Sequence, residues 1–537
     1  MPNLFGEFAV LACGGRSWCS DGVAENAIIR GAATLLAAAL AIACYAWWVK
    51  KFTKNVPPLP PGPPGLPILG NLPFLQPDLH RYFTKLSQIY GPIIKLQLGS
   101  KTCIVVSSAS VAKEVLKDHD AIFANRDPPT VAIIGTYGAC DMVWRPNGPE
   151  WRKLRRLVVS EIMSNRSLDD CYALRRREVR AMVKDIYGKV GSPVNIGDQM
   201  FLTSLDVILS VLWGGSLHGE ERSRLGIEFR QFVVEFVELL GAPNISDLFP
   251  FLTRFDLQGY QTRMEKASTW FDEIFESVIA HRIKFDQPDV GEGKKKEQKK
   301  DFLQLLMELN QQGDYKSSLS KSETKALLLD VIIAGTDATS ISLEWAMTEL
   351  LRHPDKMRRA VEELDSVVGD QNIVEEFHIP QLVYLNATVK ETFRFHPPIP
   401  LLVSHRPSAT CTVAGHTIPK DSRVLLNAWM IQRDPEFWEH PLRFEPERFL
   451  QDAEKGNYQG NNFHFIPFGS GRRICAGIPL ADKMVTNVLA TLLHSFEWKT
   501  PDGTKPDIHE KFGFALKKTE PLVAIPAARL SSSEQYQ

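Results

Sequence analysis

The stretch Pro467–Gly477, PFGSGRRICAG, decides the fold, because it surrounds the single cysteine Cys475 with glycine, arginine and an aromatic residue. Its glycines, Gly469, Gly471 and Gly477, let backbone N–H groups approach a sulfur closely, since no Cβ atom stands in the way. Such donors, together with the charge of a metal, hold a cysteine as a thiolate and adjust the potential of the metal. The stretch therefore predicts that Cys475 is a metal ligand. A free core cysteine in a glycine-rich loop is the weaker alternative.

The overall composition is that of an ordinary globular protein. The chain has 537 residues, of which 44% are hydrophobic and 23% are charged, and its net charge is -1. Because a nearly neutral chain offers no bulk attraction to a polyanion, we expect no nucleic-acid partner. Its eight cysteines include no C-x-x-C spacing, which argues against a disulfide framework and against a paired zinc site.

An uncharged segment near the N-terminus predicts a transmembrane anchor. Residues 31–49 read GAATLLAAALAIACYAWWV. A helix of this length spans about 28 Å of a ~30 Å hydrocarbon core. Two tryptophans end the segment and three lysines follow within residues 50–54, so the positive-inside rule places the rest of the chain in the cytosol and residues 1–30 on the luminal side. A cleaved signal peptide is the alternative, but the apolar run is too long for one and starts late.

The segment after the anchor is basic and rich in proline. Residues 57–67 read PPLPPGPPGLP, and proline at this density excludes a helix and favours a stiff polyproline spacer. A ligand for proline-binding domains is the alternative. We expect a hinge over residues 50–70 that orients the body which follows.

One large body is predicted over residues 71–526, with a polar tail at 527–537. Helical periodicity is clear over residues 225–240, 303–309, 323–352 and 483–496. Short β-branched runs at 93–98 and 104–107 predict a small sheet. The body should therefore be mainly α with a small β-rich subdomain (α+β), and the charged segment 287–301 should be a solvated loop.

The cysteine stretch resembles the haem-ligand signature of the cytochrome P-450 superfamily, F-x-x-G-x-R-x-C-x-G, and fills each of its fixed positions. The E-x-x-R of Glu391–Arg394 with Arg448 downstream, and the W-x-x-x-R of Trp151–Arg155, match further family motifs in the required order. Runs such as FANRDPP at 123–129 are similar to plant microsomal A-type members, in the group that contains the cadinene hydroxylase. This resemblance extends from Leu59 to the C-terminus.

The resemblance implies the cytochrome P-450 fold, a haem b cofactor and electrons from NADPH through NADPH–cytochrome P-450 reductase. It also implies a single-pass protein of the endoplasmic reticulum membrane. Cys475 would bind the iron, and Glu391, Arg394 and Arg448 would form a buried structural triad. The residues expected to hold the haem are Trp151, Arg155, His405, Phe468, Arg473 and Gly477.

The segment at 327–346, LLLDVIIAGTDATSISLEWA, is apolar on most faces and predicts the helix that crosses the core over the haem. Its AGTDAT matches the family pattern except at Ala338, which stands where family members carry a threonine that delivers protons. Gly335 is expected to leave room for dioxygen and substrate. Asp337 would supply protons, and Thr339 or Thr336 would replace the missing hydroxyl.

These features predict a monooxygenase that uses NADPH and dioxygen to hydroxylate a lipophilic plant specialised metabolite, most readily a sesquiterpene-like terpenoid. Flavonoid, phenolic and alkaloid substrates stay open. A rearrangement or dehydration that needs no dioxygen also stays open, because Ala338 departs from the family. The resemblance implies that the substrate contacts the segments 130–147, 401–403 and 512–516 and, on the helix that crosses the core, Ile333, Ala334 and Asp337.

Overall fold

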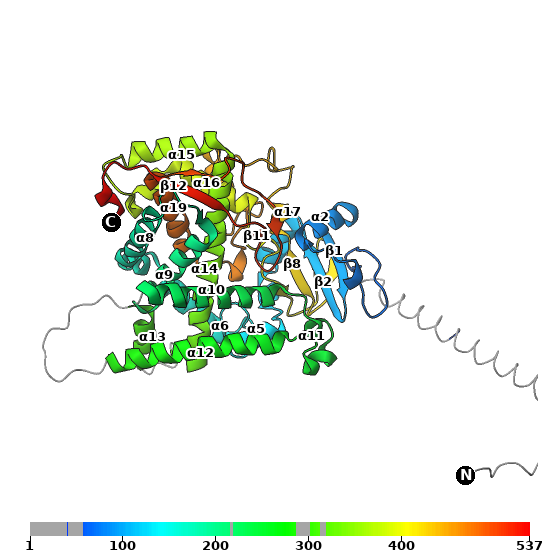
Figure 1. Cartoon of the computed structure of the whole chain (residues 1–537). Coiled ribbons are helices and arrows are strands. Elements are labelled where there is room, and N and C mark those ends of the chain that lie inside the picture. Colours follow the sequence, from blue (N-terminus) through cyan, green and yellow to red (C-terminus); the bar gives the residue numbers. More distant parts are fainter. Residues whose placement is uncertain (1–39, 41–56, 215–218, 286–300, 312–317) are drawn as a thin grey trace, which may run out of the picture. The chain divides into compact units, whose positions relative to one another are not determined.

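The computed structural model describes Leu40 and residues 57–214, 219–285, 301–311 and 318–537. Its chain divides into two units, Met1–Pro58 and Leu59–Gln537, and the second unit contains the helices and strands shown in Figure 1. The predicted luminal tail at 1–30, the predicted anchor at 31–49 apart from Leu40, and most of the predicted loop at 287–301 lie outside the described residues.

Helices make up most of the second unit, as predicted (Figure 1). The longer ones are α2 (Leu79–Tyr90), α8 (Tyr172–Tyr187), α9 (Ile196–Trp213), α10 (Gly219–Gly241), α12 (Tyr260–Phe285), α13 (Phe302–Gln311), α14 (Lys321–Arg352), α15 (Pro354–Val367), α16 (Val383–Phe395) and α19 (Ile478–Ser495). The shorter ones are α3 (Ala109–Lys113), α4 (Asp120–Phe123), α5 (Thr130–Gly135), α6 (Pro149–Leu157), α7 (Asn165–Asp170), α11 (Ile245–Leu248), α17 (Ala428–Ile431) and α18 (Arg448–Gln451). Single turns of other helix types are η1 (Leu72–Phe74), η2 (Glu114–Asp118), η3 (Val158–Ile162), η4 (Pro250–Phe255), η5 (Glu376–Gln381), η6 (Ala453–Gly456), η7 (Gly471–Arg473) and η8 (Ser533–Tyr536).

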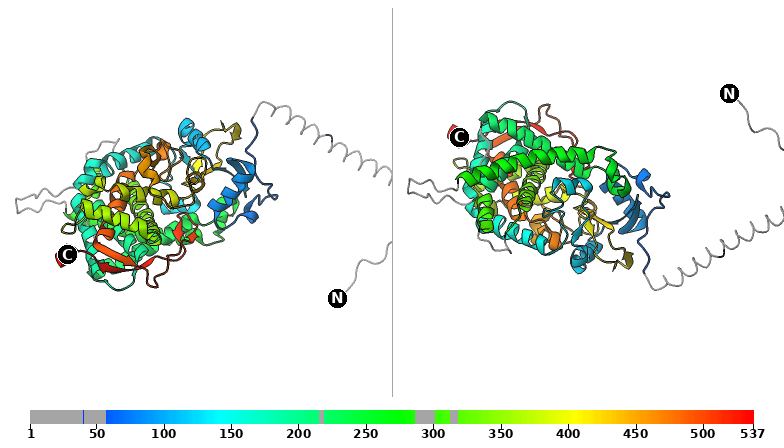
Figure 2. Two further views of the ribbon diagram at one scale, coloured as in Figure 1. Left: turned by 90° about the horizontal axis from the view of Figure 1, so that it is seen from above. Right: turned by 90° about the horizontal axis from the view of Figure 1, so that it is seen from below.

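Helix α14 passes through the middle of this unit, and helices surround it in each view (Figures 1 and 2). A capping box fixes its start, because Ser320 and Glu323 exchange side-chain and backbone hydrogen bonds. Helix α9 packs against it. Both helices are long and apolar enough to cross a membrane, but 78% of each apolar window is buried inside the protein, so they are core helices.

The strands form small sheets, of which the largest has the order β1-β2-β8-β5-β3. Its strands are β1 (Ile93–Leu98), β2 (Lys101–Val106), β3 (Asn125–Arg126), β5 (His405–Arg406) and β8 (Arg423–Leu426). The others are β4 (Val194–Asn195), β9 (Phe496–Lys499) and β12 (Val523–Ala528) in one sheet, with the pairs β6 (Cys411–Val413) and β7 (His416–Ile418), and β10 (Glu510–Lys511) and β11 (Lys517–Lys518). The sheet registers Arg126 opposite His405 across β3 and β5, which places two basic side chains next to each other.

Both predicted ends of the body need correction. The proline-rich segment belongs to the second unit from Leu59 onward, where the Lys95 N–H donates to the carbonyl of Pro61 at 2.8 Å. The predicted polar tail is also packed into the body, because Tyr536 is 1% exposed and its hydroxyl donates to the carbonyl of Ser495 at 2.8 Å. Buried backbone partners at each end, rather than composition, set these boundaries.

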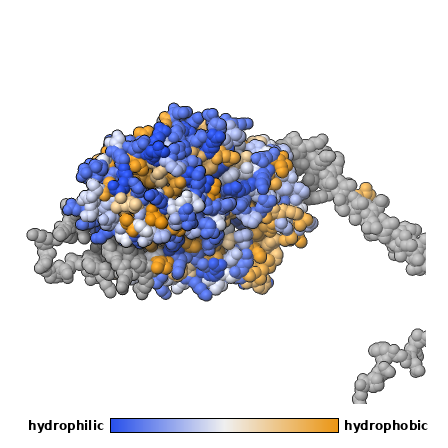
Figure 3. Space-filling view, turned by 45° about the horizontal axis from the view of Figure 1, so that its top comes forward, coloured by the Kyte–Doolittle hydropathy of each residue, from blue (hydrophilic) through white to orange (hydrophobic). Residues whose placement is uncertain are grey.

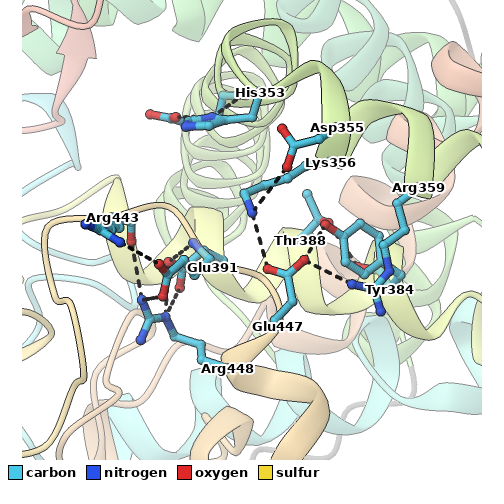
Figure 4. Close-up of polar contacts among 12 residues, drawn as sticks. His353, Asp355, Lys356, Arg359, Tyr384, Thr388, Glu391, Arg443, Glu447 and Arg448 are labelled. Atoms are coloured by element: carbon cyan, nitrogen blue, oxygen red, sulfur yellow. Dashed lines mark hydrogen bonds and ion pairs between the residues drawn. The ribbon is translucent and has the colours of Figure 1, made fainter.

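A buried charged cluster lies between α16 and the loop that precedes α18, as the sequence predicted. Glu391 and Arg394 are both fully buried and form a two-pronged ion pair, with N–O distances of 2.7 Å. Arg448 contacts the same carboxylate at 3.2 Å, and Figure 4 shows its guanidinium facing Glu391. Arg394 also donates to the carbonyls of Gln432 and Pro441 at 2.9 Å each. The triad therefore fixes the loop as well as pairing charges.

We predict that Arg448→Leu destabilises the protein by about 3–5 kcal/mol, because it leaves the carboxylate of Glu391 buried with one cation fewer. The fall in the denaturant midpoint of unfolding measures this change. The matched control is Arg443→Leu, because the side chain of Arg443 is 71% exposed and reaches Glu445 only at 4.0 Å, while its backbone carbonyl, which the substitution keeps, accepts from Arg394. Equal effects of the two substitutions would contradict the structural role of the triad.

Candidate active site

The cysteine loop runs from Pro467 through η7 to the start of α19. Gly471 has a φ of +69°, and a Cβ atom there would lie 2.3 Å from the carbonyl oxygen of Leu116, so this turn requires glycine. The Cys475 N–H donates to the carbonyl of Phe468 at 3.0 Å. The Gly477 N–H donates to the Cys475 sulfur at 3.3 Å. Of the three glycines of the predicted cradle, Gly477 therefore donates to the sulfur, whereas the Gly469 N–H donates to the carbonyl of Ile466 and Gly471 is required by the turn.

The sulfur of Cys475 faces a cavity of about 350 Å³. The side chain is exposed to this cavity, although it lies deep in the protein body. The cavity is lined by each of the four segments predicted to contact substrate, which contribute Thr136, Met142, Val143, Trp144, Ile333, Ala334, Asp337, Leu402, Val403, Phe514 and Ala515. Most of the remaining lining is apolar, including Ile208, Phe236, Val237, Leu240, Ile399 and Met484.

Four basic side chains from distant parts of the chain line the same cavity. They are Arg126, Arg155, His405 and Arg473. Burial lowers the pKa of Arg126, and the charges of Arg473 and Arg155 lower it further. Within the described part of the chain none of the three arginines forms a direct ion pair, although the charge of Asp141 acts on Arg473. A ligand that brings carboxylates would neutralise the cluster.

The four basic residues differ in how many donors they have left. Arg473 donates to the carbonyls of Ala124, Met142 and Arg145, and its guanidinium lies 4.1 Å from the centre of the Trp151 ring. Trp151 in turn donates to Met142 at 3.0 Å. Arg473 and Trp151, both predicted from the sequence, therefore line the site. Their N–H groups, however, donate mainly to backbone carbonyls.

Arg126 and Arg155 have donors that are not used. Arg126 donates to the carbonyl of Val403 at 2.5 Å, but its Nε atom is buried without a partner. Arg155 has no described hydrogen bond and contributes a positive charge near Cys475. Arg126 was missed by the sequence reasoning, although it stands in the quoted run FANRDPP. The signal was its cross-strand position opposite His405, which only the sheet register reveals.

His405 is buried, and its Nδ1 lies 2.9 Å from the carbonyl oxygen of Phe123. Because a carbonyl only accepts, Nδ1 carries a proton. Burial lowers the pKa of His405, and the neighbouring charge of Arg126 lowers it further. Phe468 lines the cavity beside Cys475 and packs edge-on against Phe393 at 5.2 Å.

These observations fit a haem. The thiol of Cys475 would serve as a ligand for its iron, and the guanidinium groups of Arg126 and Arg155 would be complementary to its two propionates. Burial raises the pKa of the Cys475 thiol, although the Gly477 N–H and the charge of Arg155 oppose this effect. A thiolate at this position therefore requires a further positive charge, which the iron provides.

The residues of α14 are arranged differently from the sequence prediction. Thr339 lines the cavity, and its hydroxyl has no described hydrogen bond. Thr336 is fully buried, donates to the carbonyl of Ile332 at 2.6 Å and does not line the cavity. Gly335 allows α9 to pack closely, because a Cβ atom there would lie 2.6 Å from Ile208. Helix packing is therefore sufficient to require glycine here, and room for dioxygen at this position stays a prediction.

Asp337 is 6% exposed, and its Oδ1 lies 2.7 Å from the Nζ of Lys517 on β11. This partner was not predicted from the sequence, because β11 follows α14 by more than a hundred residues. The side chain of Lys517 is 31% exposed, so the ion pair connects the cavity wall with the protein surface.

We predict that Arg126→Leu weakens haem retention by about tenfold or more, because hydrogen bonds to charged groups contribute roughly 1.5–3 kcal/mol each. The transfer rate of haem to apomyoglobin measures retention. The substitution should not destabilise the haem-free protein, since it removes one of several like charges. The control is Arg152→Leu on the exposed face of α6. Unchanged transfer in Arg126→Leu would contradict the assignment.

Comparison with known proteins agrees with this site. The model of the cytochrome P-450 family matches residues 60–525. A flavonoid 3'-monooxygenase of Crocosmia x crocosmiiflora is 39% identical and covers 90% of this chain and 95% of its own length. A carnosic acid synthase of Salvia fruticosa is 38% identical, with coverage of 88% and 93%. A zebra fish cytochrome P-450 solved with progesterone is similar in structure, with a TM-score of 0.72, 25% identity and coverage of 84% and 100%. The chain therefore belongs to the cytochrome P-450 family of monooxygenases, which contain haem and receive electrons from NADPH through a reductase.

Proposed function

We propose that this monooxygenase hydroxylates a lipophilic terpenoid of plant specialised metabolism, with a sesquiterpene-like skeleton. The observation that supports the proposal is the apolar wall over Cys475, where aliphatic and aromatic side chains predominate. Transfer of a hydrocarbon skeleton from water to such a wall is favourable, because it buries apolar surface. A substrate with several hydroxyls would bury some of them without partners, at a cost of roughly 1–3 kcal/mol each.

A second candidate is a flavonoid or another phenolic. It is supported by the names of relatives, which include the flavonoid 3'-monooxygenase and a 3,9-dihydroxypterocarpan 6A-monooxygenase of Glycine max that is 37% identical. The carnosic acid synthase supports the terpenoid instead. Relatives with similar identity carry names from different chemical classes, so they do not separate the two candidates, and our preference for the terpenoid rests on the apolar wall of the cavity.

The residues around the cavity divide the work of the reaction. When bound, the haem supplies the iron at which dioxygen is activated and the substrate is oxidised. Cys475 would hold that iron, and Arg126, Arg155 and His405 would hold the propionates. The apolar side chains orient the substrate and exclude water. Asp337 and Thr339 stand on α14, on the wall that also carries Ala334 and Ala338.

Proton supply should pass through Thr339 in this chain. The position that carries the family's threonine is Ala338, which lines the cavity without a hydroxyl. Thr339 also lines the cavity and retains a free hydroxyl, whereas the hydroxyl of Ser342 donates to the carbonyl of Ala338 at 2.8 Å. Asp337 can return a proton to Thr339, because the ion pair with Lys517 connects the carboxylate of Asp337 with the protein surface.

The test is a reaction panel with microsomes that contain the full chain and a plant reductase. Sesquiterpenes, flavonoids and alkaloids are incubated with NADPH, and products are identified by mass spectrometry. We expect a hydroxylated terpenoid that requires both NADPH and dioxygen and is absent with Cys475→Ala. A phenolic product alone would favour the second candidate. A product formed without NADPH or dioxygen would instead support rearrangement or dehydration.

We also propose that the chain is held on the endoplasmic reticulum membrane by a single span, with this body in the cytosol. An exposed apolar patch supports contact of the body with a lipid surface. It consists of Ile68, Phe74, Phe251, Phe255 and Leu257, each at least 51% exposed. The patch comes from two segments, 68–74 and 251–257, that lie on either side of the turn between β1 and β2. In that turn the Gly99 N–H donates to the carbonyl of Leu69, and the Ser100 N–H donates to the carbonyl of Leu248. Figure 3 shows apolar side chains gathered at this end of the body.

We predict that Phe251→Ser with Phe255→Ser reduces vesicle binding of a chain that starts at Leu59, because less apolar surface enters the interface. Sedimentation with phosphatidylcholine vesicles measures the bound fraction. The matched control is Phe377→Ser, since Phe377 is 68% exposed and lies on η5, outside the patch. The same loss in both proteins would show that the patch has no special role.

We predict that Thr339→Ala uncouples the reaction. NADPH should still be consumed, but the ratio of hydrogen peroxide to product should rise by about tenfold or more. A positioned acid or base contributes roughly 10²–10⁴-fold to a proton transfer, and that contribution would be lost. Peroxide and product per NADPH are measured together. Thr336→Ala is the control, because its hydroxyl is bonded within α14 away from the cavity. Equal uncoupling in both variants, or a strong gain of coupling in Ala338→Thr, would contradict a relay through Thr339.

A further inference from the structure

Two aspartates from different elements meet beside the cavity. Asp330 lies on α14, and Asp141 lies on the α5–α6 loop, residues 136–148. They are 8% and 0% exposed, and their side chains hydrogen-bond to each other. Ionised carboxylates only accept hydrogen bonds, so this contact requires a proton on one of the two.

Backbone N–H groups of the loop attach it to this pair. The Met142 N–H donates to Asp330 at 2.7 Å, and the Trp144 N–H donates to Asp141 at 3.2 Å. The other oxygen of Asp141, Oδ1, is buried and accepts from no N–H or hydroxyl group of the described chain, which leaves it to the carboxyl of Asp330. Met142, Val143 and Trp144 line the cavity. The contacts with Asp141 and Asp330 therefore fix the position of these three residues against α14.

Within the described residues neither aspartate has a cation as its ion-pair partner. Arg473 faces Asp141, but its guanidinium donates to backbone carbonyls. The other charged groups of the loop and of the facing turns of α14 are paired elsewhere: Arg145 with Glu323, Lys325 with Asp272 and Glu276, and Asp337 with Lys517. Burial raises the pKa of Asp141 to about 6, and burial together with the charge of Asp141 raises the pKa of Asp330 well above the usual range of an aspartate.

The loop does not hold this shape through its own backbone preference. Tyr137 and Ala139 have φ values of +54° and +58°, which residues other than glycine rarely adopt. A second attachment comes from the Tyr137 hydroxyl, which donates to Asp272 of α12 at 3.0 Å. A loop in this conformation depends on such attachments to stay closed.

We propose that Asp141 and Asp330 share one proton and are positioning residues that hold the α5–α6 loop closed against α14. Removal of the proton leaves two negative charges in contact in a dry site, so the loop separates from the helix. The carbonyl of Met142 also accepts from Trp151 and Arg473 at 3.0 Å, so an opened loop disturbs the wall of the cavity and the basic cluster together. The inference does not depend on the identity of the substrate.

The direction of the pH dependence follows from the raised pKa values. The folded pair binds its proton more tightly than the unfolded chain does, so its contribution to stability is greatest in acid. That contribution is lost as the pH rises from the ordinary value of aspartate, about 3.9, through the raised values of the pair. Alkaline conditions should therefore open the loop.

The test is amide hydrogen exchange of the full haem-loaded chain in detergent, between pH 6 and 9, followed by mass spectrometry. After correction for the intrinsic pH effect, peptides from residues 137–147 should exchange up to about tenfold faster per pH unit, because opening releases one proton. Peptides from α19 should not change in this way. An α5–α6 loop whose exchange follows only the intrinsic pH effect would overturn the proposal.

Variants separate the shared proton from a general structural role. Asp330→Asn replaces the protonated acid with an amide donor that does not titrate, so the loop should stay protected at every pH, and Asp141→Asn should act similarly. Asp330→Leu should expose the loop at every pH. The exposed Asp502→Asn is the control and should behave as the unchanged protein. Loop exchange in both Asn variants that still accelerates with pH as in the unchanged protein would refute the shared proton.

Discussion

The position of the loop that carries Cys475 depends on the buried ion pair between Glu391 and Arg394. Arg394 bonds to the carbonyl of Gln432, and the side-chain amide of Gln432 returns a bond to Phe393 at 3.0 Å and accepts from the Ile466 N–H at 3.1 Å. Ile466 begins the turn that leads to Cys475. A charge pair on one helix thus fixes a ligand loop that is remote in sequence, because each link is a buried hydrogen bond that is costly to leave unmade.

The buried arginines discussed above find their hydrogen-bond partners in two different ways. Arg394 has a carboxylate, and Arg473 has backbone carbonyls, so both are satisfied by the chain itself. Arg126 and Arg155 have no such set of partners among the described residues, and they lie at the same cavity as the thiol of Cys475. An unpaired buried cation is expensive unless a ligand completes it. This contrast supports the proposal that the carboxylates of the haem would lie on this side of the cavity.

Local sequence patterns predicted the parts of this fold that depend on neighbours in the chain. Periodicity located α14 and α19, and glycine spacing located the turn around Cys475. Contacts between distant segments could not be read in the same way: the register that sets Arg126 beside His405, and the packing of Ile208 that requires Gly335. The hydroxyls of Thr336 and Thr339 look equivalent in the sequence, and only the rotation of the helix in its core distinguishes them.

Helix α14 carries two carboxyl groups on one face, about two turns apart, and the protein accommodates each in a different way. Asp330 shares its environment with Asp141, whereas Asp337 pairs with Lys517. The wall above Cys475 therefore carries one negative charge, on the pair that shares a proton, and Asp337 is matched by Lys517. An anionic substrate would find no free cation on this wall and would lose its hydration on entry. An uncharged substrate meets no such penalty, so the electrostatics of α14 favour the same lipophilic class as the apolar side chains around it.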